Sequence, residues 1–113
     1  MKLGVIIEKA GLEILTEREI GDINISRGLS GDLLSYILSK GGDDTLWITI
    51  QRHVNIIAVA SSVGIPAIVL CDNIKPDRKV IDTAEENEII LLNTGRDAFS
   101  ISGIICRMLD ETL

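Results

Sequence analysis

Three short apolar runs in the sequence constrain the fold more than any other feature. TLWITI (45–50), AIVLC (67–71) and EIILLN (88–93) are nearly continuous in apolar residues, and one helix-length segment separates each run from the next. Buried parallel strands joined by crossover helices have this pattern, because helices cover both faces of such a sheet. We therefore expect an α/β fold in three layers, with a mainly parallel central sheet and right-handed crossovers.

The segment before residue 45 has a weaker pattern. Helical spacing of apolar residues predicts a short helix in 3–11, and Gly11 suits the left-handed position after a helix. Alternation of apolar and polar residues predicts two short strands, in 12–16 and 19–26, whose directions the sequence leaves open. In 30–42 a helix is expected, with Ser30 as its N-cap. Its expected buried stripe is Leu34, Ile37 and Leu38.

The crossover segments differ in amphipathicity. Segment 53–64 is apolar around most of its circumference, so it must be covered on two sides, and we expect it to offer a self-association surface. Segment 76–88 reads as a solvated helix with its charges outward. In 94–109, Thr94 and Asp97 have capping-box spacing, and Gly103 is expected to permit close helix packing.

Composition and charge narrow the class of protein. The 113 residues suffice for one continuous core, so we expect a single domain over 1–113. Hydrophobic residues make up 46 % but aromatic residues only 3 %, which predicts an aliphatic core. A net charge of −6 without a basic cluster disfavours nucleic acid as a partner. No run approaches the ~20 apolar residues of a membrane span, and no signal peptide is apparent, so we expect no membrane association and a cytoplasmic location.

The cysteines do not predict a metal centre. Cys71 and Cys106 are far apart and lack zinc-ligand or disulfide-framework spacing, so both are expected to be buried apolar residues. No cofactor is predicted. The phosphate loop of nucleotide-binding enzymes, the glycine-rich dinucleotide fingerprint and HExxH are absent from the sequence. These absences disfavour a kinase, a dehydrogenase or a metalloenzyme.

Candidate ligand-binding residues follow the three buried runs. In a parallel sheet, the loops at the carboxyl ends of the strands lie along one edge, next to helix N-termini that favour anions. The loop of Ser30 and Asp32 joins them if its strand runs the same way. The candidate residues at this edge are Gln51, Arg52, His53, Asn55, Asp72, Asn73, Thr94, Gly95 and Arg96.

Each candidate has a structural alternative. Arg52 and Arg96 are suited to clamp a phosphate or carboxylate with their planar guanidinium groups, or they are solvated loop residues. His53, the only histidine, either contacts a ligand or only packs and caps at a helix start. Cys71 has no second histidine to complete a nucleophile with a base, so a catalytic cysteine is disfavoured.

Four segments resemble the DRTGG domain family, which is similar to the N-terminal domain of the bacterial HPr serine kinase. They are SGDLLSYIL, LWITIQRHVNIIAVAS, IPAIVLCDN with the following KPDRKVIDTAEENEIILLNT, and DAFSISGII. The resemblance runs from Leu12 to the end and implies a compact α/β domain without the kinase's catalytic half. The string Asp-Arg-Thr-Gly-Gly itself is replaced by QRHVN (51–55).

The resemblance also implies a role. Members of this family occur as regulatory modules beside CBS domains in some pyrophosphatases, within some phosphotransacetylases, and as small free-standing proteins that pair with a copy of themselves. We therefore expect a non-enzymatic regulatory or adaptor domain, a homodimer with a protein partner, that binds a small anion or nucleotide at the carboxyl edge. The alternative is an adenine-nucleotide or phosphorylated-metabolite sensor with a dedicated pocket built on Arg52, Asn73 and Arg96.

Overall fold

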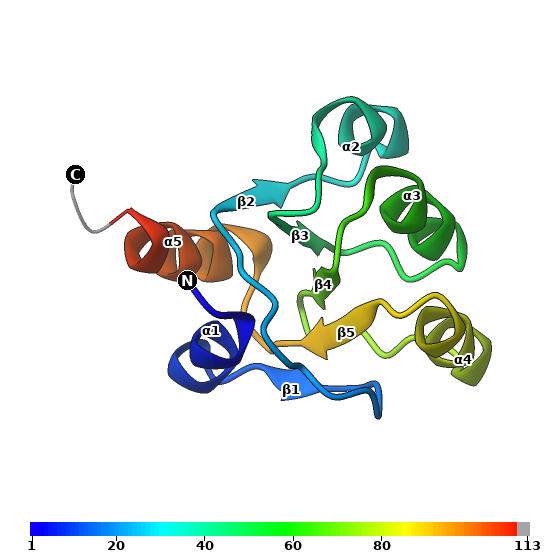
Figure 1. Cartoon of the computed structure of the whole chain (residues 1–113), viewed down its shortest axis with the longest axis horizontal. Coiled ribbons are helices and arrows are strands. Elements are labelled where there is room, and N and C mark those ends of the chain that lie inside the picture. The colour runs from blue at the N-terminus through cyan, green and yellow to red at the C-terminus, as the bar shows by residue number, and fades with distance from the viewer. Residues whose placement is uncertain (111–113) are drawn as a thin grey trace.

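The computed structural model describes residues 1–110 and contains one five-stranded sheet between two layers of helices (Figure 1). In chain order the elements are α1 (Leu3–Ala10), β1 (Glu13–Ile14), β2 (Arg27–Ser30), α2 (Leu34–Lys40), β3 (Thr45–Thr49), α3 (Asn55–Val63), β4 (Ala67–Leu70), α4 (Arg78–Glu86), β5 (Ile90–Asn93) and α5 (Ala98–Leu109). The strand order is β1-β5-β4-β3-β2, and only β1 runs antiparallel to its neighbour. The predicted α/β fold with a mainly parallel sheet is confirmed.

The two faces of the sheet explain why the three central strands are apolar at every position. Side chains alternate between the faces along a strand. Trp47 and Ile68 pack under α2, α3 and α4, whereas their neighbours Ile48 and Val69 pack under α1 and α5. Figure 1 shows these two helical layers on opposite sides of the sheet. Because both faces are covered, no position in β3, β4 or β5 is left for a solvent-facing polar residue.

The strand predicted in 19–26 is wrong, and the edge strand β2 begins only at Arg27. Segment 19–26 is instead irregular chain beside α1, where Leu3 N–H donates to Ile23 O and Ile25 N–H donates to Met1 O. Its apolar residues fill the core under α1. The alternation of apolar and polar residues in this segment therefore reflects core packing rather than a strand of the sheet. The strand predicted in 12–16 is reduced to Glu13–Ile14.

The start of α2 also differs from the prediction. Ser30 ends β2, and the N-cap of α2 is Leu33, whose side chain makes no capping hydrogen bond. Ile37 is buried as predicted, but Leu38 is 46 % exposed. Trp47 explains part of the difference, because its indole N–H donates to Gly31 O and holds the chain after β2 in a loop.

The apolar helix α3 is covered within the domain. It packs on the sheet and contacts α2 and α4. Its exposed positions are Asn55 at its first turn and three small residues: Ala58, Ser61 and Ser62. Self-association through α3 stays a prediction, but the apolar character of this helix does not require it, because α2 and α4 already cover both flanks.

At α5, Asp97 alone caps the helix, accepting a hydrogen bond from Ser100 N–H at 2.8 Å. Thr94 lies outside the helix and takes no part in a capping box. A Cβ at Gly103 would meet no atom within 4 Å, so this glycine does not serve close packing inside the domain. Cys106 is exposed, whereas Cys71 is buried as predicted. Within residues 1–110, no helix is both long and apolar enough to cross a membrane.

Candidate functional site

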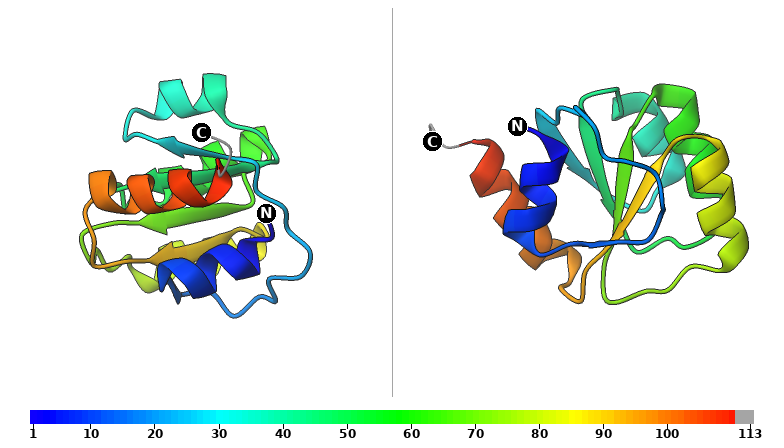
Figure 2. Two further views of the ribbon diagram at one scale, coloured as in Figure 1. Left: turned by 90° about the vertical axis from the view of Figure 1, so that its left-hand side faces the viewer. Right: turned by 60° about the horizontal axis from the view of Figure 1, so that its bottom comes forward.

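The loops after β3, β4 and β5 lie along the same edge of the sheet, and the predicted site residues fall into two groups there. The right-hand view of Figure 2 shows the loops after β4 and β5 side by side at the bottom. The loop after β3 instead faces the beginning of α4. Asn73 and Arg96 do not line the hollow that Arg52 lines.

The first group lines a hollow of about 580 Å³, which we call the basic pocket. It lies between the β3–α3 loop and the first turn of α4. Its lining residues are Ile50, Gln51, Arg52, His53, Val54, Asp77, Lys79 and Val80.

Two cations of the basic pocket are available to a ligand. Within the described part of the chain, no hydrogen bond or ion pair occupies the side chains of Arg52 and Lys79, and both residues are exposed. Asp77 is the N-cap of α4 but its side chain makes no capping hydrogen bond, so the first N–H groups of this helix lack that partner. A helix N-terminus adds partial positive charge to that of the two side chains. The two cations and the helix start suit an anion, and they outweigh the one carboxylate that lines the pocket, that of Asp77.

His53 takes part in the start of α3. Its Nδ1 accepts a hydrogen bond from Asn55 N–H at 3.2 Å, and its carbonyl oxygen accepts one from Ile56 N–H. An accepting Nδ1 places the proton of the neutral ring on Nε2, which is then a hydrogen-bond donor. Asn55 itself is the first residue of α3 and does not line the pocket.

The second group, which we call the tied corner, consists of Asp72, Asn73, Thr94, Gly95 and Arg96. Asp72 N–H donates to Arg96 O at 2.9 Å, and Asn73 N–H donates to Thr94 O at 2.8 Å. Both donors have left-handed backbone conformations, with φ of 55° and 56°. The Arg96 guanidinium donates to Ser100 Oγ. These backbone amides are therefore consumed within the protein and are not free to bind a ligand.

Asn93, which was not predicted as functional, holds the tied corner in place. It is 3 % exposed at the end of β5, and its amide Nδ2 donates to Ile74 O at 2.6 Å. Its Oδ1 accepts a hydrogen bond from Lys75 Nζ. A buried amide of this kind fixes a loop because its polar atoms must be satisfied. In the sequence, the only indication of this role is that the polar Asn93 ends the apolar run 88–93.

Acidic groups surround the end of β4. Burial, and then the carboxylates of Asp72, Asp32 and Asp97, raise the pKa of the Cys71 thiol from 9.0 to about 11. This thiol is therefore protonated at neutral pH and is a poor nucleophile. The negative charge around Cys71 also disfavours anions there, in contrast to the basic pocket.

The sequence did not identify Lys79 or Asp77 as site residues. Both belong to a helix that was interpreted only as a solvated face. The one indication in the sequence is that α4 follows a parallel strand, so its first turn, with Lys79, must lie at the carboxyl edge of the sheet. Nothing in the local pattern indicated that this helix start lies beside the β3–α3 loop.

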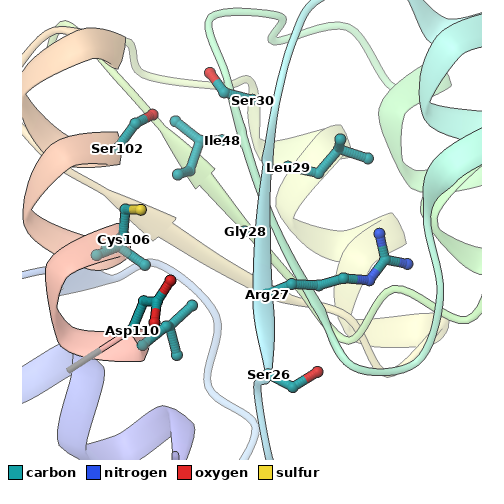
Figure 3. Close-up of a pocket in the computed structure, with 11 residues that line it drawn as sticks. Ser26, Arg27, Gly28, Leu29, Ser30, Ile48, Ser102, Cys106 and Asp110 are labelled. Carbon is teal, nitrogen blue, oxygen red and sulfur yellow. The ribbon is translucent and has the colours of Figure 1, made fainter. Parts of the chain in front are cut away.

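A further hollow of about 490 Å³ lies between β2 and α5, away from the predicted site residues (Figure 3). Figure 3 shows Ser102 and Cys106 on the α5 side and the backbone of β2 opposite them. Ile48 lies between the two elements. Within residues 1–110, Ser102 Oγ is the buried side-chain polar atom that has no hydrogen-bond partner.

Comparison with known proteins gives a family and a fold. The DRTGG domain family matches residues 13–108. The structure is similar to the CBS and DRTGG domains of the regulatory region of Clostridium perfringens pyrophosphatase, complexed with the activator diadenosine tetraphosphate. The TM-score is 0.72 at 16 % sequence identity, and the similarity covers 99 % of this chain and 50 % of that chain. This chain thus spans about half the length of that one, and at this identity the likeness shows the fold alone. No curated protein matches the sequence.

Proposed function

Because the chain belongs to the DRTGG domain family, we propose that it is a non-enzymatic regulatory domain that binds a small phosphate-bearing ligand in the basic pocket. An adenine nucleotide is the expected class of ligand. The observation that carries the proposal is that two unpaired cations, Arg52 and Lys79, line one hollow beside the start of α4. The proposal treats residues 1–113 as a single domain that works in the cytoplasm. The similarity to the N-terminal domain of the HPr serine kinase stays a prediction.

The electrostatics of the chain favour this pocket over other sites for an anion. The protein carries a net charge of −6, so most of its surface repels phosphates. Two unpaired cations on opposite walls of one hollow attract the same anion together, which separate cations on a flat surface do not. A guanidinium offers paired donors to phosphate oxygens, and a lysine adds a mobile point charge.

Adenine nucleotides are the first ligands to test. The similar pyrophosphatase region is described in complex with diadenosine tetraphosphate, an activator of that protein. A hollow of about 580 Å³ is within the range of ordinary small-molecule sites. Gln51 lines the same hollow, where its side-chain Nε2 donates to Asp32 O at 3.1 Å.

Thermal unfolding with and without ligand tests this proposal. Inorganic pyrophosphate, ATP and diadenosine tetraphosphate are the probes, because a ligand that binds only the folded protein raises its stability. We expect a concentration-dependent rise in Tm with at least one probe. The double variant Arg52→Gln/Lys79→Gln should abolish the rise. The matched control Lys9→Gln/Arg107→Gln removes the same charge outside the pocket and should retain it.

Two results would contradict the proposal. One is the absence of a change in Tm with every probe. The other is an equal loss of the ligand-induced rise in Tm in the pocket variant and in its control. The proposal that the domain is not an enzyme is tested separately, by measuring the concentrations of ATP and pyrophosphate over time in the presence of the protein. We expect no turnover, because the Cys71 thiol is protonated and His53 Nδ1 already accepts a hydrogen bond from the backbone.

Self-association is a second candidate function, favoured by the surface around β2. The N–H groups of Arg27 and Gly31 donate to Asp44 O, just before β3, and to Ile48 O, within β3. The N–H and C=O groups of the intervening Gly28 and Ser30 therefore face the open edge of the sheet. Beside this edge lie Leu33, which is 68 % exposed, and Tyr36, whose ring approaches Gly31. We propose that this side forms the interface of a homodimer or the contact with a protein partner.

Sedimentation equilibrium at high micromolar concentration tests this second function. We expect a dimer for the native sequence and a weaker dimer for Leu33→Ser/Tyr36→Ser. Val5→Ser/Ile14→Ser removes exposed apolar side chains from α1 and β1 and should leave the dimer unchanged. A monomeric native protein under these conditions excludes the homodimer.

A further inference from the structure

One residue outside the basic pocket holds the wall that carries Arg52. Asp32 lies in the connection between β2 and α2 and does not line the pocket. Its Oδ1 accepts hydrogen bonds from Thr49 Oγ1 at 2.6 Å and from Ile50 N–H at 2.9 Å. Its carbonyl oxygen accepts a third, from Gln51 Nε2 at 3.1 Å. We call these three hydrogen bonds the Asp32 clasp.

The clasp acts on the segment that leaves β3. Thr49 is buried, with 1 % exposure, so its hydroxyl group has few alternatives. It donates to Asp32 and accepts a hydrogen bond from Gln51 N–H at 3.1 Å, which relays the constraint one residue further. Each residue from Thr49 to Gln51 is thus fixed to Asp32 directly or through this hydroxyl. Arg52 is the next residue, so its backbone is placed by the clasp.

The charge of Asp32 opposes the function of the pocket. The negative charge of a carboxylate near an anion site weakens anion binding. The hydrogen bonds of the same carboxylate hold the pocket wall and so favour binding, which gives the two effects opposite signs. Removing a residue that acted only through its charge would strengthen binding. Removing a residue that positions the wall would weaken binding, because a cation displaced from its ligand loses the hydrogen bond.

We propose that Asp32 is a positioning residue for the basic pocket, required for ligand affinity although it does not touch the ligand. This inference rests on the proposed function of the pocket. The Asp32 clasp sets the path of residues 49–51 and thereby the position of the Arg52 guanidinium. It also joins the pocket wall to the beginning of α2, so the two move as one unit.

Isothermal titration with inorganic pyrophosphate tests the inference. We expect Asp32→Ala to raise the Kd for pyrophosphate about tenfold. This factor corresponds to the loss of roughly one hydrogen bond between the displaced Arg52 guanidinium and the ligand. Asp32→Asn keeps an acceptor oxygen at the same position and removes the charge, so its Kd should stay within about twofold of the native value or fall. Asp43→Ala removes an exposed carboxylate elsewhere and should leave Kd unchanged.

The outcomes separate the inference from the proposed function. Equal or tighter binding by Asp32→Ala overturns the inference, and so does an equal loss in Asp32→Ala and Asp32→Asn. Absence of binding by the native protein overturns the proposed function itself. Urea unfolding of each variant shows whether it folds. If Asp32→Ala does not fold, Thr49→Val decides: it removes the relay hydroxyl, and unchanged affinity would overturn the inference.

Discussion

The basic pocket and the tied corner lie on the same edge of one sheet, yet their chemistry is opposite. In the basic pocket, Arg52 and Lys79 have no partner within the described residues, and the adjoining helix start lacks a side-chain cap. In the tied corner, the backbone amides of Asp72 and Asn73 are bonded to the neighbouring loop. The comparison shows that position at the carboxyl edge is not enough for a binding site. The polar groups there must also be left unsatisfied by the protein.

The largest expected effect concerns the acidic surroundings of Cys71, beside the tied corner. The folded pKa of about 11 lies above the ordinary 9.0, so the stabilising effect is complete below pH 9 and is lost as pH rises toward 11. In that window the unfolded chain ionises first, and the loss amounts to about 3 kcal/mol over the two pH units. Urea unfolding between pH 8 and 11 measures it.

Two variants isolate this contribution from the other groups that titrate in the same range. Cys71→Ala should flatten the decline in the free energy of unfolding, whereas Cys106→Ala, which changes the exposed thiol, should keep it. An identical decline in both variants would show that Cys71 ionises normally in the folded protein.

The next effect concerns Asn93, which fixes the tied corner. Asn93→Ala removes the amide donor to the part-buried Ile74 O and a long hydrogen bond to the buried Leu70 O, and it should reduce the free energy of unfolding by about 2 kcal/mol. Affinity for pyrophosphate should not change, because Asn93 does not line the basic pocket. The exposed Asn24→Ala is the control, with an expected change below about 0.5 kcal/mol. A large loss of affinity in Asn93→Ala would mean that the two regions are coupled.

The smallest effect compares two arginines at the same edge. Arg52→Gln should raise the Kd for pyrophosphate about tenfold with little change in stability, because it removes a cation from the pocket. Arg96→Gln should change Kd less than twofold, since its guanidinium donates to Ser100 on α5 and faces no hollow with Arg52. Titration calorimetry on the two variants measures both. Equal losses would place the ligand across both regions rather than in the basic pocket.

The sequence predicted the sheet well where the residues are buried on both faces. Continuous apolar runs in β3, β4 and β5 admit few other structures, and the loops after them were placed at one edge by strand direction alone. It failed for β2, which has only one buried apolar residue, Leu29, because the strand lies at an edge of the sheet with one side open. It also misassigned the helix start at Ser30, because a favourable capping residue is only a local preference and the Trp47 hydrogen bond to Gly31 opposes it.

The amino-acid sequence by itself determined the fold class, the burial of the three central strands and the identity of the loops at the carboxyl edge. Local patterns suffice for these, since hydrophobic periodicity is written in neighbouring residues. Only the tertiary structure decided that Arg52 lies with Lys79 rather than with Arg96, and that Asp32 accepts hydrogen bonds from the segment just before Arg52. Those contacts join residues far apart in the chain, and they depend on how the helices pack and on which amides the loops use for one another.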